Sequence, residues 1–268
     1  RSYSVTGVQT CALPICMLHF SALGVDWFAE SPFSQCYDGA YHNQVLVDGL
    51  SQPTNLPGFA NAYQAAATYL GARTAAGGGF AAADLTASYS YRWLTQPPQS
   101  WPDGIRALGW EMDPSEEIRR LFAGTARMKL RFWWPSYTTC NFIPTCRAPF
   151  NPMRHVFRTV GVVRGPHPYG LVLDDLGKDD QPRLYQWTAM LNANVRRAAL
   201  PGTRPGELVL RHAPDAAPAL PEAGAPLLLV RCLGAVDGLD VETLDGPPDR
   251  KGQVLPYTRL TASVRGAE

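Results

Sequence analysis

The residues with the clearest capacity for chemistry open the stretch from Tyr41 to Gln52. A polar pair, His42-Asn43, precedes alternating residues that end in Asp48-Gly49. Alternation closed by Asp-Gly predicts a strand that runs into a tight turn. His42 would then stand at the entrance of the strand, where a rigid backbone can aim the imidazole at a ligand. The alternative is a histidine that caps the strand through backbone hydrogen bonds.

The rest of the sequence lacks several common catalytic motifs. It has no glycine-flanked serine elbow with an associated histidine and no His-Glu-x-x-His motif. The run Gly77-Gly78-Gly79 is not a phosphate loop, because no Lys-Ser or Lys-Thr follows it. Arg127, Lys129 and Arg131 alternate along one predicted strand face. That basic face either meets an acidic sugar or is simply solvated.

The elements that must position these residues are mostly strands. We expect a hairpin from Leu18 to Ala29, and a second from Val156 to Leu176 whose closing Asp174-Asp175 accepts backbone hydrogen bonds at the turn rather than binding metal. Short helices are predicted at Ala60–Leu70, before Gly71, and from Asp113 to Ala123. Further strands are predicted at Phe80–Trp93, Arg127–Trp134, Leu184–Leu191, Leu208–Leu210, Leu227–Cys232 and Leu255–Val264.

Composition agrees with many short strands and turns. The chain has 268 residues, 24 Gly and 24 Pro, with 7 Trp and 11 Tyr. Its net charge of +1, with 18% charged residues, gives no basic patch that would indicate a nucleic-acid partner. No apolar run is long enough to predict a membrane span. Cys140 and Cys146 are compatible with a disulfide in an exported protein or with free thiols.

The segment His-Asn-x-Val-Leu-Val-Asp-Gly-x-x-Gln, which begins at His42, resembles the one that marks the C-terminal β-domain of the heparinase II/III-like polysaccharide lyases. The hairpin at Val156–Leu176 and the Tyr-x-Trp of Leu184–Leu191 resemble further strands of that domain. The resemblance covers about Leu18 to Val264. It implies an all-β fold over residues 17–268, a large antiparallel β-sandwich with one or two short helices in insertions.

The resemblance also implies a Zn²⁺ site. In the family, the histidine of the His-Asn pair is a metal ligand, which here is His42. The second ligand is an acidic residue at the end of the first hairpin, which here is Glu30 where the family usually has Asp. Asp26 is the other candidate, although it falls within the strand. The remaining family ligand comes from a His-x-Asp segment upstream, and His19 is not expected to replace it because it stands inside a strand.

The activity that the resemblance implies is β-elimination at a uronic acid within an acidic polysaccharide. Most catalytic groups of the family come from an N-terminal (α/α) toroid, and this chain contains no run of amphipathic helices that could form one. No catalytic residue is therefore assigned in this chain. The family also implies a periplasmic or extracellular location. A non-catalytic carbohydrate-binding or interaction sandwich is the alternative function.

The first residues do not resemble a folded segment. Val5 to Ile15 look like the translation of a sequencing-library adapter, and no signal-peptide pattern is present. We expect residues 1–16 to be an unstructured artefact and the natural protein to continue upstream. On this interpretation, the missing toroid and the His-x-Asp segment belong to that upstream part.

Overall fold

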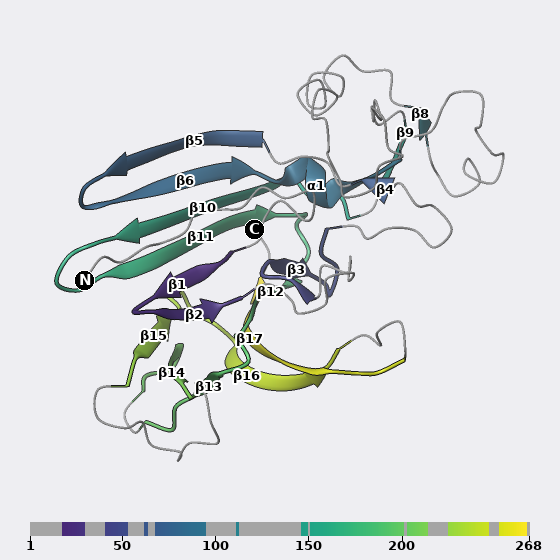
Figure 1. The fold of residues 1–268 in the computed structure, drawn as a ribbon. Helices are drawn as coiled ribbons and strands as arrows, with labels where there is room; N and C mark the ends of the chain where they lie inside the picture. Colours follow the sequence, from purple (N-terminus) through teal and green to yellow (C-terminus); the bar gives the residue numbers. More distant parts are fainter. Residues whose placement is uncertain are drawn as a thin grey trace, which may run out of the picture. The chain divides into compact units, whose positions relative to one another are not determined.

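The computed structural model describes residues 18–29, 41–52, 62–63, 68–94, 111–112, 146–149, 151–200, 203–213, 225–246 and 252–266. The chain divides into two compact units (Figure 1). The first comprises residues 1–51 and 179–268, and the second comprises residues 52–178. Both are built from antiparallel strands, so the predicted all-β class is confirmed. No helix in these ranges is long and apolar enough to cross a membrane.

The first unit contains three antiparallel sheets. One is the hairpin of β1 (Phe20–Ala22) and β2 (Val25–Phe28). The second has the order β16-β17-β12-β3, and the third has the order β13-β14-β15. Their strands are β3 (Val45–Val47), β12 (Arg183–Met190), β13 (Val195–Arg197), β14 (Glu207–His212), β15 (Leu227–Arg231), β16 (Gly238–Asp245) and β17 (Pro256–Gly266).

The inner faces of these sheets meet in one hydrophobic core. Trp27 of β2 is fully buried among side chains from β12, β14 and β17, and its indole nitrogen donates to the carbonyl of Ala22 at 3.1 Å. Leu228 and Val230 of β15 pack against this core, while Leu227 and Leu229 are exposed. This alternation is what a two-layer sandwich requires, because successive side chains of a strand point to opposite faces.

Two tight turns hold the predicted hairpins of the first unit. Leu23 and Gly24 join β1 to β2 with φ angles of 57° and 77°. Asp48 and Gly49 follow β3 with φ angles of 54° and 79°. Positive φ at both central residues is the geometry that Asp-Gly favours in two-residue hairpin turns, so the turn predicted from Asp48-Gly49 is confirmed. The Asp48 carboxylate also accepts from the backbone of Leu184 at 3.1 Å.

The second unit contains two four-stranded sheets, with the orders β11-β10-β6-β5 and β4-β7-β9-β8. In Figure 1, β5, β6, β10 and β11 run side by side as long strands. The elements are β4 (Ala62–Tyr63), β5 (Thr68–Ala75), β6 (Gly78–Asp84), α1 (Thr86–Ser90), β7 (Tyr91–Leu94), β8 (Glu111–Met112), β9 (Cys146–Pro149), β10 (His155–Val163) and β11 (Tyr169–Gly177).

Glycine is required where β6 meets β10. A Cβ added to Gly78 would lie 2.1 Å from the carbonyl oxygen of Val162, a distance that no side chain tolerates. A Cβ on Gly79 would lie 2.7 Å from the carbonyl oxygen of Arg73 on β5. Gly78 and Gly79 therefore serve the close approach of strands in this sheet, whereas a Cβ at Gly77 would meet nothing within 4 Å. They start β6 after a tight turn from β5.

Two predictions from local sequence were wrong in this unit. The helix expected at Ala60–Leu70 is replaced by β4 and the start of β5, and β5 continues through Gly71. The strand expected over Phe80–Trp93 is interrupted by α1. Helix propensity is a weak guide that strand pairing overrides, since Ala62–Tyr63 pair with β7 and the strand from Thr68 pairs with β6. The signal for α1 was Asp84, whose carboxylate accepts from the Thr86 backbone at 2.9 Å, as a helix cap does.

The interpretation of Asp174-Asp175 was also wrong. Both residues lie inside β11, and strand alternation directs them to opposite faces. The carboxylate of Asp174 receives two hydrogen bonds from Arg158, at 2.6 and 3.0 Å, and both side chains are largely buried. The carboxylate of Asp175 lies 3.0 Å from the imidazole of His155. The cross-strand ion pair with Arg158 thus accounts for the position of Asp174 better than a cap at the turn does.

Several predicted features fall outside the described ranges. These are the helix at Asp113–Ala123, the basic strand at Arg127–Trp134, the acidic residue Glu30, and Cys140 as partner of Cys146. The hairpin at Val156–Leu176 is confirmed by β10 and β11, whose nine-residue registers match without a bulge. The strands predicted at Leu184–Leu191, Leu208–Leu210, Leu227–Cys232 and Leu255–Val264 correspond to β12, β14, β15 and β17.

Candidate functional site

The His42 segment enters the edge of a sheet. β3 is shorter than predicted and pairs only with Tyr185–Trp187 of β12. His42 lies three residues before it and is 3% exposed. Its carbonyl oxygen accepts from the Thr188 hydroxyl at 3.0 Å, and the Gln44 carbonyl accepts from the Thr188 backbone at 2.8 Å. The backbone on both sides of Asn43 is therefore fixed to β12.

Asn43 is the residue that joins this segment to the first hairpin. Its side-chain amide donates to the carbonyl of Ala29, at 3.0 Å, and to that of Leu18. Its side-chain oxygen accepts from the backbone of Met190 at the end of β12. One buried asparagine thus satisfies groups from three separate segments, which fixes the position of the neighbouring His42.

Asn43 connects the two segments that carry the predicted metal ligands. Ala29, which precedes Glu30 in the chain, is bonded to Asn43, which follows His42. The residues flanking the two predicted ligands are therefore in contact, while Glu30 itself lies outside the described ranges. Among the residues that the structure describes, no three His, Cys, Asp or Glu side chains are grouped so as to hold a metal ion.

His19 and Asp26, the other residues considered for the metal, lie together on the solvent face of the β1–β2 hairpin. The imidazole of His19 lies 2.9 Å from the Ser21 hydroxyl and 3.4 Å from the Asp26 carboxylate. The Ser21 hydroxyl donates to the same carboxylate. Both His19 and Asp26 are exposed, on the face opposite Phe20, which packs toward the core.

The hydrogen bonds within the hairpin change the acidity of Asp26. The Ser21 hydroxyl, followed by the His19 imidazole, holds the pKa of the Asp26 carboxyl below its ordinary value of 3.8. Both groups donate to the ionised carboxylate and so favour the charged form. The carboxylate is therefore the form present at neutral pH, which leaves it available as an acceptor.

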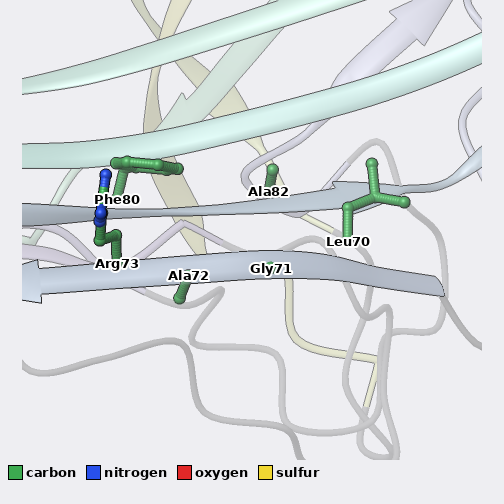
Figure 2. Close-up of a pocket in the computed structure, with 6 residues that line it drawn as sticks. All are labelled: Leu70, Gly71, Ala72, Arg73, Phe80 and Ala82. Carbon is green, nitrogen blue, oxygen red and sulfur yellow. The ribbon is translucent and has the colours of Figure 1, made fainter.

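A second feature, which the sequence did not indicate, lies on the sheet of β5 and β6. A shallow hollow of about 290 Å³ opens there, lined by Leu70, Gly71, Ala72, Arg73, Phe80 and Ala82. Figure 2 shows Leu70, Phe80 and Ala82 on one side of the two strands, Ala72 on the other, and Arg73 beside Phe80. The pairing of Arg73 with Phe80 and of Gly71 with Ala82 explains the arrangement, because directly paired residues share a face.

Comparison of the chain with models of known protein families gave no match, and comparison with curated proteins gave none. The arrangement of the residues themselves therefore carries the functional argument.

We predict that Asn43→Ala lowers the free energy of unfolding by more than about 2 kcal/mol, because it leaves the Met190 amide and two carbonyls without their partner. Asn43→Asp is expected to destabilise similarly, since a carboxylate cannot donate to Leu18 and Ala29. Urea unfolding of the purified chain measures both. Asn194→Ala is the matched control, with an expected change within about 0.5 kcal/mol. Equal free energies of unfolding for Asn43→Ala and Asn194→Ala would contradict the structural role assigned to the Asn43 side chain.

We predict that Ser21→Ala raises the pKa of Asp26 toward its ordinary value, and by more than His19→Gln does, because the hydroxyl is the larger cause of the depression. Carboxyl chemical shifts measured against pH report both values. Since the folded pKa is lowered, this interaction stabilises the fold above the unfolded pKa, and the stabilisation is lost as the pH falls through the folded pKa. If the pKa of Asp26 were the same in Ser21→Ala as in the unsubstituted chain, the Ser21 hydroxyl would not be the larger cause of its depression.

Proposed function

We propose that this chain is the β-sandwich portion of a polysaccharide lyase similar to the heparinase II/III-like enzymes, acting on a polysaccharide that contains uronic acid. The observation that supports it most is the Asn43 clamp, by which we mean the hydrogen bonds of the Asn43 side chain with Leu18, Ala29 and Met190. Through Asn43, the His42-Asn43 pair is hydrogen-bonded to Ala29 at the end of the first hairpin. A site shared by His42 and Glu30 would require this proximity. The antiparallel sandwich of the first unit supports the same proposal.

β-Elimination beside a carboxylate needs three groups. One neutralises the carboxylate, a base removes the adjacent proton, and an acid protonates the leaving oxygen. We assign none of these three roles to a residue of this chain. In the proposal, an N-terminal helical toroid supplies the base and the acid, and the sandwich forms the wall that holds the acidic polysaccharide. The expected periplasmic or extracellular location belongs to the same proposal.

Zn²⁺ is the ion proposed at His42 and Glu30. Structural zinc sites use four protein ligands and catalytic sites use three, whereas these residues provide two. Among the described residues, no three His, Cys, Asp or Glu side chains are grouped around His42. The described residues therefore do not by themselves complete a zinc site, and no step of the reaction is assigned to the metal.

A non-catalytic carbohydrate-binding sandwich is the second candidate. The specific observation in its favour is that Asn43 is fully used in backbone hydrogen bonds. The conspicuous His-Asn pair then has a structural explanation that requires no metal. Both candidates bind an acidic polysaccharide, and they differ in whether a catalytic partner domain acts on it.

We predict that the chain binds polymers of uronic acid without cleaving them, because the proposal assigns the base and the acid of the elimination to the helical toroid. Affinity electrophoresis through gels containing polygalacturonate, alginate or hyaluronan should retard the chain, while a neutral dextran gel should not. The absorbance of unsaturated uronate should stay at the level of the buffer. Unsaturated product formed by this chain would overturn the assignment of the base and the acid to the toroid. Equal mobility in every gel would overturn the proposal that the chain binds an acidic polysaccharide.

We predict that the chain retains zinc weakly, at well below one ion per chain after dialysis, because two ligands bind zinc less tightly than three or four. His42→Ala should remove the remaining bound zinc. The exposed His19→Ala variant is the matched control and should keep the content of the unsubstituted chain. Elemental analysis of the three dialysed proteins measures this. Equal zinc in His42→Ala and the unsubstituted chain would exclude His42 as a ligand.

A further inference from the structure

The sheet of β5, β6, β10 and β11 presents one face rich in exposed apolar side chains. The register places Phe80, Phe157, Val163 and the β11 residues Tyr169, Leu171 and Leu173 on the same face, and each of them is exposed. A contiguous exposed apolar face on a soluble protein is commonly a binding surface. The hollow beside Phe80 lies on this face.

The shape of the hollow follows from a bulge and from small residues. The register of β5 against β6 shifts between Tyr69 and Gly71, so Leu70 is the extra residue and stands 56% exposed at one side of the hollow. Gly71 pairs with Ala82, and neither fills the space between the strands. Phe80, 50% exposed, forms the opposite side. Gly71 and Ala82 thus form the floor of the hollow, between the apolar side chains of Leu70 and Phe80.

The charge of the hollow comes from Arg73. Its register partner is Phe80, and Figure 2 shows the two side chains beside each other. Arg73 is exposed, and it makes no ion pair within the described ranges. Ala82 pairs with Thr159 of β10, which therefore lies on the same face of the sheet. An aromatic ring and a guanidinium thus border one shallow floor.

We infer that this hollow binds a uronate residue of an acidic oligosaccharide. The apolar face of a sugar ring packs on the ring of Phe80, as apolar surfaces pack on aromatic side chains. Its carboxylate pairs with the Arg73 guanidinium, whose planar fork matches a carboxylate. Arg73 is the charged residue among those that line the hollow, whereas Asp84 and Asp175 of the same face lie outside the lining, against Thr86 and His155. A neutral apolar partner would leave the Arg73 cation unpaired, so the charge of the hollow favours an anionic sugar over a second protein. The inference rests on the proposed function and adds the place where the polysaccharide lies.

Calorimetry of the full chain tests the inference with tetramers of galacturonate, mannuronate and hyaluronan, and with methyl-esterified tetragalacturonate as the uncharged counterpart. We expect Arg73→Gln to weaken binding of the acidic tetramer about tenfold or more. Phe80→Ala should weaken it about three- to tenfold. Ala82→Leu, which fills the hollow, should abolish binding. Arg73→Gln should leave binding of the methyl ester nearly unchanged, because that ligand has no charge to pair.

Two exposed residues outside the hollow provide matched controls. Arg164→Gln removes an equal charge near the tip of the β10–β11 hairpin, and Tyr69→Ala removes an exposed aromatic side chain from the opposite face of the sheet, because Tyr69 pairs with Ala83. Both should bind as the unsubstituted chain does. Thermal unfolding of the Arg73, Phe80, Arg164 and Tyr69 variants should stay close to that of the unsubstituted chain, since these side chains are exposed, and the same measurement checks that Ala82→Leu remains folded.

Three results would overturn the inference, and they are distinguishable. If acidic tetramers bind equally well to Arg73→Gln, Phe80→Ala and Ala82→Leu, the hollow is not the site and the proposed function stands. If no tetramer binds the unsubstituted chain, the hollow and the polysaccharide proposal fail together. If sedimentation shows self-association that Phe80→Ala removes while sugar binding is unaffected, the face is a protein contact.

Discussion

The position of the His42 segment depends on the buried amide of Asn43. The segment connects the first hairpin with β12, which are distant in sequence, and a ladder of three residue pairs joins β3 to β12 at the sheet edge. The amide donates toward Leu18 and Ala29 and accepts from Met190. A buried amide can do this because it carries two N–H donors and one acceptor oxygen on one rigid group, whereas a carboxylate has no donor and a hydroxyl has only one. The identity of residue 43 therefore constrains where the histidine beside it can lie.

Val45, Leu46 and Val47 are all buried, although alternation predicts one exposed face for this strand. Both faces of β3 are therefore covered, between Asn43 at its start and the Asp48-Gly49 turn at its end. Asp48 adds a second anchor, since it accepts from Arg183 at 3.1 Å and from the Leu184 backbone. The segment is thus fixed at both ends, and its backbone is suited to hold a functional side chain in one orientation.

Features set by neighbouring residues could be predicted from the sequence. The turns at Leu23-Gly24 and Asp48-Gly49 depend on local φ preferences, and the hairpin at Val156–Leu176 depends on two adjacent apolar runs. Features set by strand pairing could not. Thr68–Ala75 becomes a strand because Gly78–Asp84 pairs with it, and Asp174 turns to Arg158 across the ladder. Neither partner is visible from local composition.

The same distinction separates the two candidate binding features. His42 could be selected from the sequence because its motif is continuous, and Asn43 beside it proves to connect distant strands. The hollow at Phe80 could not be selected, because it depends on how β5 and β6 pair. Continuous pairing from Ala75 and Gly78 places Arg73 opposite Phe80 and Gly71 opposite Ala82, and the bulge beyond these pairs leaves Leu70 at the side of the hollow. Shifting the register by one residue would move Arg73 to the other face of the sheet. The chemistry of this hollow therefore depends on the register that the turn between β5 and β6 fixes, because that register places the cation beside the aromatic ring.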